Sequence, residues 1–274
     1  MRYIKLSFKY LTKNFLFLFL VSLLPSVFLG AFLSPFKFLE FVNNYSNLTV
    51  SSFNDIFYSI IDISWLKILF YVISFGLIGI FVSVIIGEIE NHFRSGKRNY
   101  LNFKHYINNN ILAVLLNMIA FAIINFVVSF LCGTIIYIFH ILLCGLNTTP
   151  KTWSLIVAIL LFTIYFCVVM LAGLTLSINV PNMTYNGYNF KQAIFYTINL
   201  IGQDLFNLIL GFLVPFVAIV PLISIFSFSS LGLRFVGILC VLIAIIYYSS
   251  FVMTSFYSLS GINRYDERKY FQMR

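Results

Sequence analysis

The stretch "GEIENHFRSGKR", which ends at Arg98, carries the side chains of this chain that are best suited to chemistry. Glu88 and His92 lie four residues apart, so one face of a helix would hold both, and Arg94, Lys97 and Arg98 follow closely. These cations could bind a phosphate while His92 acts as a general acid or base. A plain intrahelical pair at the rim of a membrane and the binding of a lipid headgroup are the alternatives.

Known catalytic patterns do not fit this stretch. It matches no metalloprotease HExxH helix, no phosphate-binding P-loop and no nucleophile elbow. The apolar runs of the chain also carry no ionisable residue near their centres, which argues against a proton-driven pump. We therefore expect a protein that is not an enzyme, with no catalytic residue, no metal site and no cofactor.

The elements that must position these residues are membrane spans. The 274 residues are 61% hydrophobic and only 9% charged, and the mean hydropathy is +0.99, which is too apolar for a water-soluble domain. Six runs are long enough to cross a bilayer, and they cover about residues 14–35, 67–87, 111–143, 153–180, 208–228 and 234–257. The sequence predicts an all-α fold, a polytopic six-helix transmembrane bundle, as a single integral membrane domain over residues 1–274.

Two smaller features complete this picture of the spans. The first apolar run is longer than the apolar core of a usual signal peptide, and no small-residue cleavage site follows, so we expect a retained first span. The four cysteines fall within or at the end of apolar runs, which favours packing over disulfides or metal binding; they are Cys132, Cys144, Cys167 and Cys240.

The basic residues predict the orientation of the bundle. With both termini on one side of six spans, 13 of the 17 Lys and Arg residues fall on that side, and such an excess marks the cytoplasm. We expect a bacterial plasma-membrane protein with both termini cytoplasmic and residues 91–110 as its first cytoplasmic loop. The four basic residues left on the other side are Lys37, Lys67, Lys151 and Arg234.

Three segments are predicted to lie on the membrane surface as amphipathic helices. The N-terminal one sets Arg2, Lys5, Lys9 and Lys13 on one face and Ile4, Phe8 and Leu11 on another. The second, on the outer surface, gathers Phe53, Ile56, Phe57, Ile60 and Ile61. The third begins after Asn189, and its predicted apolar face holds Phe190, Ala193, Ile194, Thr197, Ile198, Ile201 and Leu205.

Small and polar residues follow helical spacing inside two of the spans. Gly79, Ser83 and Gly87 step by four, a pattern that permits close contact with another helix. In the third span Asn117, Asn125 and Ser129 fall near one stripe, together with Gly133. This stripe has two interpretations, which are hydrogen bonding inside the bundle and a polar path or groove for a lipid headgroup.

The chain also shows a weak threefold repeat. Phe-Lys pairs at Phe8, Phe103 and Phe190 each precede a short amphipathic segment and then an apolar run. The corresponding repeats would cover residues 1–90, 91–180 and 181–274, each an interfacial helix followed by two spans.

One stretch resembles a known family. "LSINVPNMTYNGYNFKQAIFYTINLIGQDLFNLILGFLVP" is similar to the signature of a broad bacterial family of six-span proteins, which resemble the membrane domain ahead of glycerophosphodiester phosphodiesterases. Pro181, Phe190, Ala193 and Leu200 carry the likeness. The resemblance implies a six-span topology. The catalytic phosphodiesterase barrel has no counterpart in this chain, so the resemblance implies no enzymatic activity.

These observations lead to one functional hypothesis with two alternatives. We expect a lipid-handling or partner-binding membrane module, whose partners are membrane lipids with anionic headgroups or another membrane protein, but no nucleic acid. A small lipid or solute translocator is the first alternative, and an enzyme acting on phospholipid headgroups is the second. The expected headgroup ligands form a cytoplasmic collar, which comprises Arg2, Lys5, Lys9, Lys13, Arg94, Lys97, Arg98 and Lys104.

Overall fold

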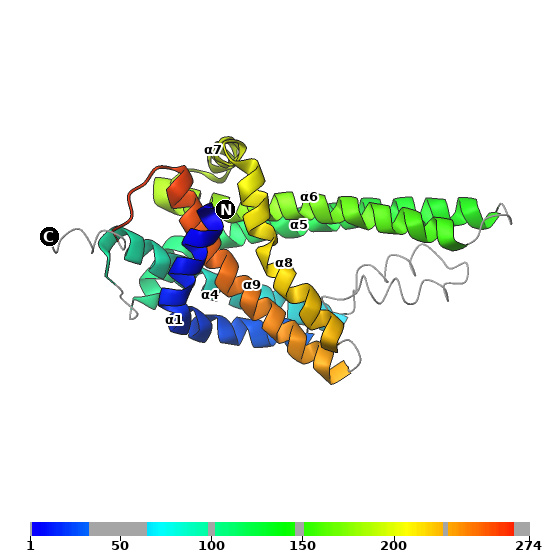
Figure 1. The fold of residues 1–274 in the computed structure, drawn as a ribbon, viewed down its shortest axis with the longest axis horizontal. Coiled ribbons are helices and arrows are strands. Elements are labelled where there is room, and N and C mark those ends of the chain that lie inside the picture. The colour runs from blue at the N-terminus through cyan, green and yellow to red at the C-terminus, as the bar shows by residue number, and fades with distance from the viewer. Residues whose placement is uncertain (1, 33–64, 98–101, 146–150, 227–229, 266–274) are drawn as a thin grey trace.

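Every regular element that the structure describes is a helix. The structure, a computed structural model, describes residues 2–32, 65–97, 102–145, 151–226 and 230–265. Its helices are α1 (Arg2–Phe32), α4 (Trp65–Ser95), α5 (Phe103–Gly145), α6 (Lys151–Asn186), α7 (Phe190–Gly202), α8 (Leu205–Phe226) and α9 (Ser230–Leu259) (Figure 1). The prediction of an all-α fold is thereby confirmed.

Most of these helices are long and apolar enough to cross a membrane. Among the described residues α1, α4, α5, α6 and α9 each meet this condition. A sixth crossing results if α7 and α8, which are bent by 98° at their break, count as one broken span. The chain is therefore a polytopic helical bundle, as expected. The outer amphipathic segment predicted over residues 53–61 lies outside the described residues.

The helices run further than the apolar runs that predicted them. α4 continues to Ser95 and α5 begins at Phe103, so much of the predicted loop over residues 91–110 is helical, and that prediction was wrong in extent. Helical hydrogen bonding persists in water, so a polar stretch ends a membrane crossing without ending the helix. α4 stops where Gly96 adopts a positive φ of 68° and donates its N–H to the His92 carbonyl at 2.9 Å.

α1 consists of two segments that meet at a bend. Asn14 has non-helical dihedral angles, and its side chain donates to the Tyr10 carbonyl at 2.8 Å. The basic segment before Asn14 packs on α9 through a stripe that includes Ser7, whose hydroxyl lies 2.8 Å from that of Thr254. The stripe of this segment that is buried in the protein is Tyr3, Ser7, Tyr10 and Asn14, whereas Phe8 of the predicted membrane-facing side is exposed.

The remaining packing gives a core with one long arm. α1 lies along α9, α5 along α6, and α4 contacts both α1 and α5. α1 crosses α9 closely where Gly30 touches the backbone of Gly237 and Ile238. The α5–α6 hairpin extends away from α8 and α9 (Figure 1), and its apolar spans are mostly exposed, whereas half of the corresponding windows in α4 and α9 is buried.

Candidate functional site

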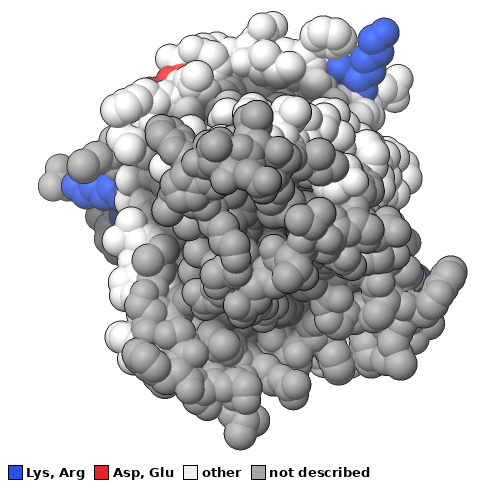
Figure 2. All heavy atoms as spheres, turned by 90° about the vertical axis from the view of Figure 1, so that its right-hand side faces the viewer, with Lys and Arg blue, Asp and Glu red and all other residues white. Residues whose placement is uncertain are grey.

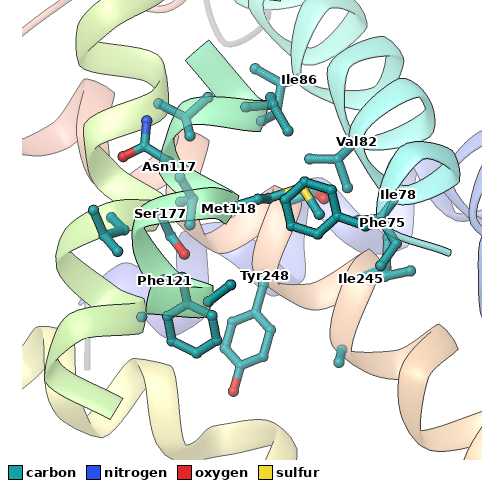
Figure 3. Close-up of a pocket in the computed structure, with 18 of the residues that line it drawn as sticks. Phe75, Ile78, Val82, Ile86, Asn117, Met118, Phe121, Ser177, Ile245 and Tyr248 are labelled. Carbon is teal, nitrogen blue, oxygen red and sulfur yellow. The ribbon is translucent and has the colours of Figure 1, made fainter. Parts of the chain in front are cut away.

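A cavity of about 520 Å³ lies where α4, α5, α6, α8 and α9 meet (Figure 3). Most of its lining is aliphatic or aromatic, and its size falls within the usual range of ligand pockets. The apolar lining comprises Phe75, Ile78, Val82 and Ile86 of α4, Val114, Met118, Phe121 and Ala122 of α5, Gly173, Leu176 and Val180 of α6, Phe212 of α8, and Ala244, Ile245 and Val252 of α9. The polar lining comprises Asn117, Asn125, Ser177, Tyr248 and Ser249.

Small residues bring α4 against α5 beside this cavity. A Cβ atom added at Gly79 would lie 2.8 Å from Leu115, and one at Gly87 would lie 2.6 Å from Tyr106. Ser83 is fully buried between them, and its carbonyl accepts a hydrogen bond of 3.2 Å from the Asn110 side chain. Gly79, Ser83 and Gly87 thus all lie at the face of α4 that meets α5.

A buried hydrogen-bond network ties the cavity wall to α7. The Asn117 side chain donates to the Ala113 carbonyl at 2.8 Å, and its Oδ1 accepts a bond of 2.9 Å from Asn179 of α6. The Asn179 Oδ1 in turn accepts from the Thr197 hydroxyl of α7 at 3.2 Å. Asn182 donates to that same hydroxyl at 3.1 Å. Three helices therefore share one set of amide and hydroxyl groups.

Asn125 and Tyr248, two further polar residues of the lining, also bond to protein groups. Asn125 accepts a hydrogen bond from the Tyr165 hydroxyl of α6. The Tyr248 hydroxyl donates to the Phe212 carbonyl at 2.9 Å, which joins α9 to α8. Ser129 is buried further along α5 and does not line this cavity. The cavity surface is therefore apolar in character, since its amides and its tyrosine hydroxyl already bond to protein groups.

The network was only partly anticipated from the sequence. Asn117 and Asn125 were expected to share a stripe, and both line the cavity. Asn179, Asn182 and Thr197 were missed. Their signal is the pair of asparagines in "SINVPN", because amides inside an apolar run are costly unless another helix satisfies them.

Arg94, expected as a headgroup ligand, contacts protein groups in the structure. Its guanidinium forms an ion pair of 2.6 Å with Glu90 and lies 4.4 Å above the centre of the Tyr185 ring. Half of the Arg94 side chain stays exposed. Arg264 makes a similar contact, 4.0 Å above the Phe93 ring. Arg94 thus joins α4 to α6 through Tyr185, and only its pairing with Glu90, one helical turn before it, has a signal in the sequence.

The other collar residues differ in their surroundings. Arg2, Lys5, Lys9, Lys13, Lys97 and Lys104 are all exposed, whereas Arg98 lies outside the described residues. Four of the exposed members lie in the first segment of α1, Lys97 follows the end of α4, and Lys104 lies at the start of α5. Lys13 is distinguished from the rest because it borders a second cavity.

The two residues that were candidates for acid–base chemistry each contact a different neighbouring helix. Glu88 is almost fully buried and faces Tyr106 of α5. His92 faces α1 instead, with its Nδ1 at 3.2 Å from the Tyr10 hydroxyl. Within the part of the chain that the structure describes, no group of three or more His, Cys, Asp or Glu residues could hold a metal ion.

Comparison with known protein families, with curated proteins and with solved structures finds no match. The geometry of the chain itself therefore carries the functional argument.

Proposed function

We propose that this multi-pass membrane protein is a non-enzymatic lipid-handling module, which holds the apolar part of a lipid in the cavity between α4, α5, α6, α8 and α9. The observation that carries the proposal is the lining of a 520 Å³ cavity by side chains that are mostly apolar, within a bundle of membrane-crossing helices. A lipid chain can enter such a space without losing hydrogen bonds to water, because it makes none.

A hydrophilic solute fits the same cavity less well. Its polar groups would need new partners, yet the amides of Asn117 and Asn125 and the hydroxyl of Tyr248 already bond to protein groups. Leaving the polar groups of a solute unpaired would cost about 1–3 kcal/mol each. The small-lipid translocator remains the second candidate, since Asn117 and Asn125 line one side of the space.

The proposal can be tested by filling the cavity. Ser177 lines it from α6, so Ser177→Phe would occupy the space that we assign to a lipid chain. A phosphatidylcholine with a photoreactive diazirine on one acyl chain is incorporated into membranes that contain the protein. After illumination, mass spectrometry of the peptides locates the adducts. We expect adducts on Met118 and Ile245 in the unchanged protein, and a loss of several fold in Ser177→Phe.

The matched control is Thr163→Phe, which places the same ring on the exposed face of the same helix. Its adducts on Met118 should match those of the unchanged protein. Adducts confined to exposed residues in all three proteins would contradict the proposal.

Family membership remains a proposal beside this one. Pro181, Ala193 and Leu200, three of the residues that carry the resemblance to the bacterial six-span family, are buried at the end of α6 and in α7. A shared requirement for docking α7 on α6 would account for a signature at this place. The bacterial plasma membrane likewise remains the proposed location.

A further inference from the structure

A second cavity of about 390 Å³ lies beside the bend of α1. Lys13 and Asn14 border it at the bend, Leu16, Phe17 and Leu20 border it along the apolar segment, and Phe103 borders it from the start of α5. None of these residues lines the central cavity, so the two spaces are separate.

The cavity has one charged end and an apolar wall. Lys13 is the last residue of the basic segment before the bend at Asn14, and Leu16 and Leu20 follow it in the first two turns of the apolar segment. Both leucines are largely exposed, at 75% and 62%. A cation at the membrane surface above an apolar wall of this depth matches a phospholipid, whose phosphate lies at the surface and whose chains lie in the core.

The surrounding charge favours an anionic lipid over a zwitterionic one. Neither α1 nor α5 contains an Asp or a Glu, so the two helices that line the cavity contribute only positive formal charges to it. Lys104, next to Phe103, is exposed and adds a second positive charge near this corner.

We propose that this corner binds an anionic glycerophospholipid, with its phosphate against the Lys13 ammonium group and an acyl chain along Leu16, Leu20 and Phe103. The proposal goes beyond the function of the central cavity and does not depend on it. It also assigns the headgroup to a particular place on the basic collar, one with an adjoining space for the acyl chain.

The test uses a tryptophan beside the cavity as a reporter. Phe103→Trp is made in a chain whose own tryptophans are replaced, Trp65→Phe and Trp153→Phe. The protein is placed in phosphatidylcholine vesicles that contain either brominated phosphatidylglycerol or brominated phosphatidylcholine at equal mole fraction. We expect brominated phosphatidylglycerol to quench the fluorescence of the tryptophan at position 103 with an apparent affinity about fivefold higher than that of brominated phosphatidylcholine. This factor is the effect of one cation near the membrane surface.

Two substitutions at Lys13 and one control decide the outcome. Lys13→Gln should remove most of the preference for phosphatidylglycerol, leaving only the weaker contribution of Lys104, and Lys13→Arg should restore it. Lys5→Gln removes an exposed charge outside this cavity and should retain most of the preference. Equal quenching in the protein that keeps Lys13, or an undiminished preference in Lys13→Gln, would overturn the proposal.

The same reporter separates this proposal from the function of the central cavity. Ser177→Phe should leave the preference for phosphatidylglycerol unchanged, since Ser177 borders only the central cavity. Loss of the preference in Ser177→Phe would mean that the two sites are one, and would also overturn the assignment to Lys13.

Discussion

Asn179 is the residue on which the contact between three helices depends. It is completely buried, donates to Asn117 of α5 and accepts from Thr197 of α7. A buried amide is costly in an apolar setting unless its donor and acceptor are both used, and here both are. Each polar partner would be left without this bond if Asn179 became apolar. Together with Asn182, which bonds to the Ala193 carbonyl and the Thr197 hydroxyl, the residue helps to hold α7 on α6.

We predict that Asn179→Leu lowers the free energy of unfolding by about 1–2 kcal/mol, because the Asn117 and Thr197 side chains lose a shared partner. Unfolding in detergent by a chemical denaturant measures this difference. The control is Asn109→Leu on α5. The Asn109 side chain is exposed, and its Nδ2 lies 3.1 Å from the His105 Nε2 of the same helix. Equal stability of the two variants would show that the network contributes little.

At the scale of elements, α4 and α5 approach closely because two glycines leave room. The Cβ of Tyr106 and the side chain of Asn110 occupy the space that a side chain on Gly87 would need. Leu115 fills the corresponding space at Gly79. In lipid, helix contacts of this kind gain from van der Waals packing, since there is no water to exclude.

We predict that Gly87→Leu destabilises the bundle by about 1–3 kcal/mol, because the larger side chain forces α4 away from α5. Gly76→Leu on the same helix is the control, since a Cβ at Gly76 meets no atom within 4 Å. The measurement is the fraction of protein that elutes as a single species in size-exclusion chromatography after heating in detergent. If both variants lost the same fraction of single species, the cause would be the replacement of glycine within α4 and not the contact between α4 and α5.

The spacing of apolar residues predicted where the helices lie in the sequence far better than it predicted which surfaces they pack against. The expected interfacial helix after Asn189 exists as α7, and its start is correct. Of its expected apolar face, Ala193, Thr197 and Ile201 are buried in the protein and Ile198 is exposed, while Leu205 belongs to α8. The spacing of apolar residues defines a face but not the surface that it meets. Spacing placed Thr197 on this face, but its hydrogen bonds with Asn179 and Asn182 of α6 depend on residues outside α7.

In the candidate site, too, the sequence predicted helix faces but not the contacts between helices. The glycine positions and the asparagine stripe were visible in the sequence, because spacing alone places residues on a helix face. The cavity was not visible, since it needs five helices whose relative positions depend on contacts between distant residues. The contact of Arg94 with Tyr185 is another example, as the two residues lie 91 positions apart.

At the scale of the whole molecule, charge is concentrated at one end of the bundle. The first segment of α1, the end of α4, the start of α5 and the end of α9 all lie toward the left of Figure 1. Most of the described basic residues lie in these parts of the chain or, like Arg264, in the segment that follows α9. Figure 2 looks at the opposite end, where the described residues in view are mostly uncharged. The arrangement places the first and the last described residues on the same side.

This asymmetry predicts which end meets the cytoplasm, because basic residues near membrane crossings are retained on that side. We predict that Lys97→Cys, in a chain whose four native cysteines are replaced, reacts with a membrane-impermeant maleimide only after the cells are permeabilised. Lys97 is exposed just after α4 ends, so its position is accessible once the reagent reaches that side. Val50→Cys, in the segment between α1 and α4 that lies outside the described residues, should react in intact cells. Labelling of position 97 from outside intact cells would reverse the orientation. It would also place the corner beside Lys13 in the outer leaflet.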